Sequence, residues 1–248
     1  MRQSYPLMGM TVSIEILDLS ASREVFEKVK DYLVYVDEKF STYKTTSEIS
    51  AINRNEIEIK NANSDMKEIF TLAEKTKEET LGYFDIKKPD GSYDPSGLVK
   101  GWAIKNAADI LSSYGYKNFF VDIGGDVEAR GLNSEGEPWS IGIRSPFKPE
   151  EIVKVVCLNN RGIATSGTYE RGQHIYNPHN FNELKDVVSL SVIAKNVYEA
   201  DRYATAGFAM GRKGIHFIES VAGLEGYMID KDSIGTETTG FRAYTKEA

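Results

Sequence analysis

Polar and hydrophobic residues alternate near the start of the chain. Val12, Ile14 and Ile16 are each preceded by a polar or charged residue. Because successive side chains of an extended segment point to opposite faces, this period of two predicts a half-buried strand over Met10–Ile16.

The apolar positions that follow have a helical period. Over Arg23–Phe40 they recur every three or four residues, which predicts an amphipathic helix with Ser22 as its N-cap. The same reasoning predicts helices over 64–82 and over about 98–114. Gly82 stands where a C′ glycine ends the first of these two, and Gly115 ends the second.

Short strand-like runs separated by turn residues dominate the second half. They are expected at Phe119–Ile123, 126–129, 139–143, Ile152–Leu158, 162–165, Val187–Ala194 and 227–229, with one helix of small residues at 198–210. Helices gathered in the first half and strands in the second predict an α+β fold. No linker, repeat or low-complexity tract divides the chain. We therefore expect 1–248 to form a single two-lobed unit, with mainly antiparallel sheets and flanking helices.

Composition and charge exclude several classes of protein. The chain has 30 Lys and Arg against 37 Asp and Glu, a formal net charge of −7, and no basic run. This argues against nucleic-acid binding. A single cysteine rules out a disulfide framework, and with only three histidines a His/Cys zinc site is not expected. Carboxylates, hydroxyls and backbone oxygens remain, and these suit Mg²⁺.

No stretch approaches the roughly 18–20 consecutive apolar residues of a membrane span. The first residues also lack the apolar core and cleavage site of a signal peptide. As written, the chain is expected to be cytoplasmic, with no transmembrane segment. A trimmed form of an exported or lipid-anchored protein would look the same.

Two segments of the first half carry unusual polar patterns. Tyr43 follows the first helix, and a core-edge aromatic before a new helix cap is one interpretation of it. Further on, Tyr83-Phe84-Asp85 precedes Asp94, which stands just before a helix start, with Lys100 six residues later. Asp94 is either a helix cap or part of a site for a phosphate or metal-phosphate, because free N–H groups at a helix start attract anions.

Two segments of the second half raise similar alternatives. A Thr-Ser-Gly turn at 165–167 leads to His174, which fits either a binding loop or a structural histidine. Asp201 and Thr205 are four residues apart, so their side chains project from one helix face. They either form an internal hydrogen bond or ligate one hard cation.

Together these segments resemble the ApbE-like family of FAD:protein FMN transferases. The likeness rests on their order and spacing, from Met8-Gly9-Met10 to the last strand, and includes Val121-Asp122-Ile123-Gly124-Gly125-Asp126. The resemblance implies an α+β fold of two β-sheet lobes related to the T-fold, with FAD between them. It also implies Mg²⁺-dependent transfer of FMN from FAD to a Ser or Thr of an acceptor flavoprotein subunit, with release of AMP.

The resemblance assigns roles to individual positions. The residues that align with contacts to the flavin nucleotide are Met8, Tyr43, Tyr83, Phe84, Asp85, Asp94, Lys100 and Ile175. Asp201 and Thr205 align with metal ligands, completed by backbone oxygens of Gly97 and Ala204. His174 aligns with the base for the acceptor hydroxyl, a role that suits an imidazole with a pKa of about 6.5.

The chain departs from the family pattern after His174. It has Asn177-Pro178-His179 where the family usually has Asp-Pro followed by Thr-Gly, so the orientation of His174 is left open. Three alternatives to transfer remain: an Mg²⁺-dependent FAD pyrophosphatase, a flavin-binding protein without turnover, and a structural domain. Tyr43 favours transfer over hydrolysis, because hydrolysing members of the family have a non-aromatic residue there.

Overall fold

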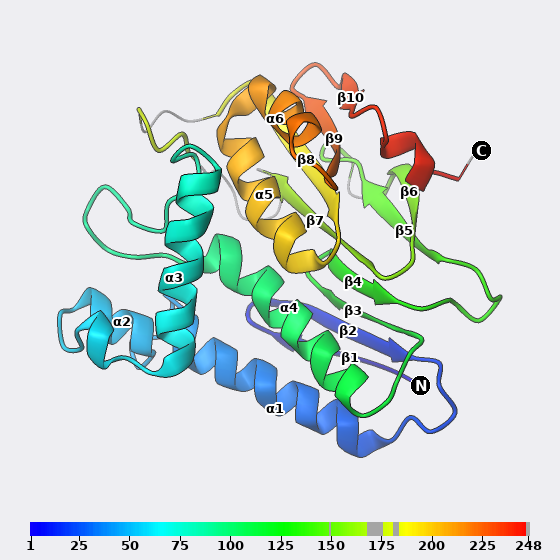
Figure 1. The fold of residues 1–248 in the computed structure, drawn as a ribbon, viewed down its shortest axis with the longest axis horizontal. Helices are drawn as coiled ribbons and strands as arrows, with labels where there is room; N and C mark the ends of the chain where they lie inside the picture. Colours follow the sequence, from blue (N-terminus) through cyan, green and yellow to red (C-terminus); the bar gives the residue numbers. More distant parts are fainter. Residues whose placement is uncertain (149, 168–175, 181–183, 247–248) are drawn as a thin grey trace.

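The computed structural model describes residues 1–148, 150–167, 176–180 and 184–246. Eight antiparallel strands of this part form one twisted sheet (Figure 1). In spatial order they are β1 (Arg2–Leu7), β2 (Met10–Ile16), β3 (Phe119–Ile123), β4 (Asp126–Arg130), β7 (Arg161–Gly167), β8 (Val187–Ala194), β9 (Glu225–Asp230) and β10 (Gly235–Glu237). A separate antiparallel pair consists of β5 (Trp139–Arg144) and β6 (Ile152–Leu158).

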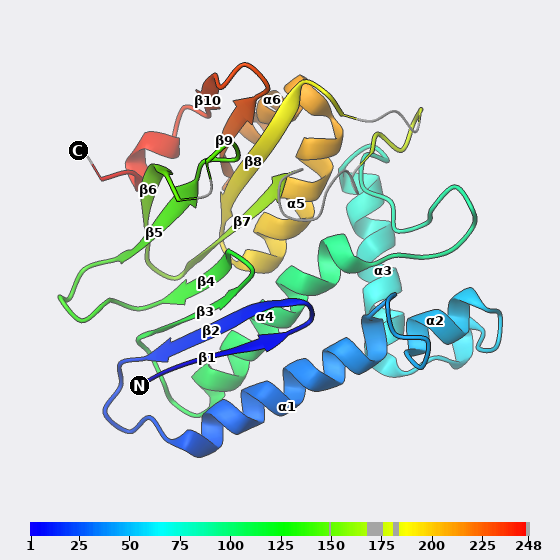
Figure 2. The same ribbon diagram turned by 180° about the vertical axis from the view of Figure 1, so that it is seen from behind.

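A layer of helices lies on one face of this sheet and extends beyond its end, as the view from behind shows (Figure 2). They are α1 (Arg23–Phe40), α2 (Glu48–Asn53), α3 (Ser64–Glu79), α4 (Ser96–Ser113), α5 (Val197–Ala209) and α6 (Gly214–Ser220). Three short 3₁₀ helices are η1 (Ile59–Asn61), η2 (Gly211–Lys213) and η3 (Phe241–Tyr244). A search of the described residues for a helix with the length and apolar character of a membrane span finds none.

The main core lies between the sheet and the helices. Leu33 of α1, Ile104 of α4 and Val121 of β3 are fully buried there. A smaller core fills the opposite face beneath the β5–β6 hairpin, because Val127 and Ala129 of β4 point that way. The mixed fold with mainly antiparallel strands is confirmed. The resemblance implied two β-sheet lobes, and this division stays a prediction; β4 pairs with β7, so the eight strands are continuous across the sheet.

The helix predicted over 64–82 ends earlier, at Glu79. The N–H of Gly82 donates to the carbonyl of Lys77 (2.8 Å), and the N–H of Leu81 donates to that of Glu78 (3.2 Å). These two bonds form a Schellman motif in which Leu81, with φ +54°, is the C′ residue. The prediction that Gly82 is the C′ residue is therefore wrong by one position, because Gly82 is the C″ residue.

The hydrophobic pattern did not predict β1, α2, α6 and β10. β1 is an edge strand with few large apolar residues, and it contains Pro6, which only an edge tolerates. It joins β2 through Met8 and Gly9, whose φ angles of +56° and +72° fit a type I′ hairpin turn. This turn places Met8 at the end of the sheet beside α1.

Candidate active site

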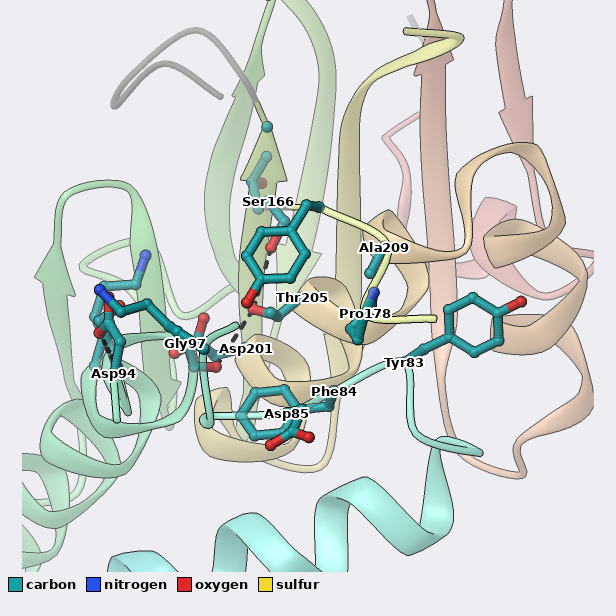
Figure 3. Close-up of a pocket in the computed structure, with 16 residues that line it drawn as sticks. Tyr83, Phe84, Asp85, Asp94, Gly97, Ser166, Pro178, Asp201, Thr205 and Ala209 are labelled. Atoms are coloured by element: carbon teal, nitrogen blue, oxygen red, sulfur yellow. Dashed lines mark hydrogen bonds between the residues drawn. The ribbon is translucent and has the colours of Figure 1, made fainter. Parts of the chain in front are cut away.

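Most of the predicted site residues line one pocket between the start of α4, the middle of α5, the end of β7 and the segment after α3 (Figure 3). We call it the Asp201 pocket. Its lining residues are Tyr83, Phe84, Asp85, Lys88, Asp94, Ser96, Gly97, Lys100, Thr165, Ser166, Gly167, Tyr176, Pro178, Asp201, Thr205 and Ala209.

Asp201 and Thr205 of α5 face the first turn of α4, as Figure 3 shows. The Thr205 hydroxyl donates to the carbonyl of Gly97 (3.3 Å), and Asp201 Oδ2 accepts from the N–H of Gly101 (2.7 Å). Ser166 Oγ lies 3.5 Å from Thr205 Oγ1. The structure thus brings together three of the four predicted metal ligands: a carboxylate, a hydroxyl and a carbonyl.

Glycines allow α4 and α5 to approach this closely. A Cβ on Gly101 would lie 2.6 Å from Asp201 Cβ and 2.8 Å from the Val197 carbonyl oxygen. A Cβ on Gly97 would lie 3.0 Å from Thr205 Cγ2. The sequence signal for this close packing is a pair of glycines four residues apart on one helix, and hydrophobic periodicity alone does not reveal it.

These oxygens fit a hard cation. Mg²⁺ is usually bound by one or two carboxylates together with substrate phosphates and water, so one buried aspartate is a sufficient protein anion. Asp201 is 3% exposed. Within the described residues no group of three or more His, Cys, Asp or Glu side chains is placed to hold a metal ion. Ala204, the fourth predicted ligand, is fully buried in α5, and its role stays a prediction.

Asp94 caps the start of α4 from one residue further out than expected. The N-cap is Pro95, and Asp94 Oδ1 accepts from the N–H of Ser96 (3.1 Å). The Asp94 N–H donates to the Ile86 carbonyl (2.7 Å), which fixes the chain before the helix begins. Of the two interpretations of Asp94, the helix cap is off by one position, although its carboxylate does bind the helix start. The role in a phosphate or metal-phosphate site stays a prediction, and Asp94 lines the pocket.

Lys100 links the start of α4 to the sheet. Its Nζ lies 2.7 Å from Asp126 Oδ2, and Asp126 Oδ1 accepts from the N–H of Thr165 (3.0 Å). The Asp126 side chain is 2% exposed, so this carboxylate is buried beside a cation. Sequence reasoning assigned no role to Asp126; the available signal was an acidic residue directly after the Gly124-Gly125 turn.

The segment after α3 forms another wall. Phe84 is 3% exposed and serves mainly the core, while Asp85 forms an ion pair with Lys77 (2.8 Å). Tyr83 packs edge-on against His179 (ring centroids 4.5 Å apart), and its ring points away from Thr205 in Figure 3. Phe84 therefore belongs mainly to the core, and the Tyr83 ring is engaged with His179 and does not face Thr205.

Met8 and Tyr43 line a second, adjoining pocket, which we call the Tyr43 pocket. Its other lining residues are Met10, Val36, Asp37, Phe40, Ser41, Thr42, Ser96, Val99 and Lys100. Ser96 and Lys100 line both pockets, so the two meet at the first turns of α4. Tyr43 is 91% exposed, and the interpretation of it as a core-edge aromatic is wrong.

His174 and Ile175 lie outside the described residues. Eight residues of the Asp201 pocket were not predicted as site residues: Lys88, Ser96, Thr165, Ser166, Gly167, Tyr176, Pro178 and Ala209. Burial raises the pKa of Tyr176 above its usual range, and the nearby carboxylates Asp85 and Asp94 add to this. The predicted Thr-Ser-Gly turn at 165–167 is wrong, because these residues continue β7 and pair with β8, and Ser166 lines the pocket from this strand end. Lys88 carried no pattern that marked it.

Comparisons with known proteins identify the family. The ApbE family model matches residues 8–88 and 87–228. A FAD:protein FMN transferase of Salmonella typhimurium is 31% identical over 160 residues, which are 60% of this chain and 46% of that protein. Another, of Haemophilus influenzae, is 25% identical over 310 residues, covering 96% of this chain and 89% of that protein. The chain spans about half the length of the Salmonella relative.

Solved structures share the fold. The flavin transferase ApbE from Vibrio cholerae has a TM-score of 0.85 at 24% identity, covering 98% of both chains. The ApbE protein from Thermotoga maritima has a TM-score of 0.87 at 21% identity, covering 100% of this chain and 99% of that one. Because the family model matches most of the sequence, this chain belongs to the ApbE family.

Proposed function

We propose that this chain transfers the FMN moiety of FAD to a Ser or Thr hydroxyl of an acceptor flavoprotein subunit, with Mg²⁺ as cofactor. One observation carries the proposal: Asp201, Thr205 and the Gly97 carbonyl converge beside the N-terminus of α4, in a pocket that adjoins a second one. A dinucleotide needs such an elongated site. The relatives named above are FAD:protein FMN transferases.

The reaction breaks the phosphoanhydride of FAD. The acceptor oxygen forms a bond to the phosphorus of the FMN half, and AMP leaves with the bridging oxygen. Negative charge gathers on the phosphate oxygens, so positioning and electrostatics dominate catalysis. The positive end of the α4 dipole and the Lys100 ammonium, which also pairs with Asp126, contribute positive potential at this point.

Mg²⁺ would be held by Asp201, Thr205 and the carbonyl of Gly97, with the substrate phosphates completing its coordination. When bound, it neutralises charge on the phosphate oxygens. The acceptor hydroxyl must also lose its proton, and His174 is the proposed base. That role stays a prediction from the sequence.

Product analysis tests this function. The protein is incubated with FAD, Mg²⁺ and an acceptor flavoprotein domain, and the acceptor is weighed while AMP is measured. We expect the acceptor to gain the mass of FMN and AMP to appear in equal amount, with no gain when the target Ser or Thr is alanine. AMP and free FMN without labelling would instead support a pyrophosphatase, and intact bound FAD would support a binding protein.

Asp201→Asn tests the metal site. Asparagine keeps an oxygen to accept from the Gly101 N–H but lacks the negative charge that a cation needs. We expect Mg²⁺-dependent turnover to be lost while the thermal midpoint stays close to wild type. Asp232→Asn, an exposed carboxylate away from both pockets, is the matched control and should retain full activity. Full activity in Asp201→Asn would refute the assignment.

A further inference from the structure

A buried arginine follows Asp201 on α5. Arg202 is 5% exposed, and all five of its N–H groups find acceptors. Nε and Nη2 donate to Glu199 Oε2 (2.8 and 2.5 Å), and Nη1 donates to Glu79 Oε2 (2.5 Å) and Thr76 Oγ1 (3.3 Å). Nη2 also donates to the Tyr203 hydroxyl (3.3 Å). Such a complete set offsets the cost of taking the charge out of water.

Aromatic rings hold the guanidinium in place. Its Cζ lies 4.2 Å from the centroid of the Tyr203 ring and 5.5 Å from that of Tyr198. A planar guanidinium can stack on rings and serve two carboxylates at once, whereas a lysine ammonium cannot reproduce that geometry. The fixed arrangement therefore depends on arginine, and charge alone would not maintain it.

The network connects two helices whose backbones are not closely packed. Thr76 and Glu79 belong to the last turn of α3, whereas Arg202 and Glu199 belong to α5. Long side chains thus fix the end of α3 relative to the helix that carries Asp201. Because Arg202 is buried, removing one of its carboxylate partners leaves its charge less fully compensated, so this link is sensitive to substitution.

The end of α3 in turn holds a wall of the Asp201 pocket. Thr80 Oγ1 accepts from the N–H of Phe84 (3.1 Å). The Phe84 ring lies next to Gly97 on the same side as Thr205: a Cβ on Gly97 would be 3.5 Å from Phe84 Cε2 and 3.0 Å from Thr205 Cγ2. A shift at the end of α3 would therefore move Phe84 relative to the Gly97–Thr205 contact.

We infer that Arg202 is a positioning residue for the flavin-nucleotide site: by linking α3 to α5, it fixes the distance between the Phe84 wall and the Asp201–Thr205 ligands. The inference rests on the proposed function for its ligand. Arg202 is absent from the lining of both pockets, so it acts through Glu79 and Phe84 rather than on the substrate.

Arg202→Lys tests the inference, since it keeps the positive charge and loses the planar guanidinium that binds two carboxylates at once. Arg130→Lys is the matched control, because Arg130 also binds two carboxylates, Asp109 and Glu128, but lies on β4 outside both pockets. We expect both variants to lower the thermal midpoint. Only Arg202→Lys should lower kcat/KM for FAD, by about 10- to 100-fold, because small displacements of a reacting group carry a cost of that order.

Amide hydrogen exchange at Phe84 gives a second measurement that needs no ligand. Exchange there should accelerate in Arg202→Lys and stay at the wild-type rate in Arg130→Lys. Equal kinetic effects in the two variants, or unchanged exchange at Phe84, would overturn the inference. Wild-type protein that binds no FAD would refute the proposed function, and the exchange rates would still decide on Arg202. If Arg202→Lys does not fold, Glu79→Ala removes the acceptor on α3, so it breaks the same link and carries the same expectations.

Discussion

At the scale of single residues, the geometry of the site depends on two glycines of α4. Gly97 and Gly101 have no Cβ, and this absence lets α5 lie against α4 so that Asp201 reaches a backbone N–H on the neighbouring helix. Glycine inside a helix normally costs about 1 kcal/mol relative to alanine. Here that cost is offset by a contact between helices that any side chain would prevent.

Gly101→Ala should therefore destabilise the protein, in spite of alanine's higher helix propensity. The new Cβ would lie 2.8 Å from the Val197 carbonyl oxygen, a backbone atom that cannot rotate away. We expect a loss of about 1–3 kcal/mol in the free energy of unfolding, measured by urea denaturation, together with loss of turnover. Lys105→Ala, half-exposed on the same helix, is the control. A more stable Gly101→Ala would contradict the close packing described above.

At the scale of elements, the link between α3 and α5 also predicts a pH dependence. Burial by itself would raise the pKa of Glu79, but hydrogen bonds and charge from Arg202 outweigh it and hold that pKa below its ordinary value of 4.5. A carboxyl group whose pKa is lowered by folding stabilises the protein above its ordinary pKa. That contribution is lost as the pH falls from the ordinary pKa through the lowered one.

Glu79→Gln should thus have a lower free energy of unfolding than wild type at pH 7. The difference between the two free energies should become smaller as the pH falls below 4.5. Urea denaturation at several pH values between 7 and 3.5 measures this. Glu78→Gln, which alters an exposed neighbour, should differ little from wild type at any of them. A difference between wild type and Glu79→Gln that stays constant with pH would exclude the ion pair as its source.

Elements with a strong local period could be predicted from the sequence. The bounds of α1, β6 and β8 agree with the sequence pattern, because burial of one face and the flanking cap and turn residues are encoded locally. Edge strands such as β1 and β10 could not be predicted, because they bury few side chains and their pairing depends on distant segments.

Only the local part of the candidate site could be predicted from the sequence pattern. Asp201 and Thr205 share a helix face, so the i, i+4 spacing brought them together. Their partners on α4 are about 100 residues away in the sequence, and only the family resemblance pointed to Gly97. The pairing of Lys100 with Asp126 and the contacts of Arg202 join segments that no periodicity relates.

At the scale of the whole molecule, the two pockets adjoin at the first turns of α4. The Tyr43 pocket is built by the β1–β2 turn and α1, the Asp201 pocket by α5 and β7, and they share Ser96 and Lys100 of α4.

If FAD occupies both pockets, its binding should slow amide hydrogen exchange in the segments that line each of them. With Mg²⁺ and FAD at 100 times the dissociation constant, we expect stabilisation by about 2.7 kcal/mol. Hydrogen exchange should slow both in the turn at Met8 and Gly9 and in the segment from Tyr83 to Asp94. FMN or AMP alone can fill only one end, so each should protect one of these two segments and leave the other exchanging at the ligand-free rate. If FMN alone or AMP alone slowed exchange in both segments, the two pockets would respond as one unit. That result would contradict the proposal that each pocket binds one half of FAD.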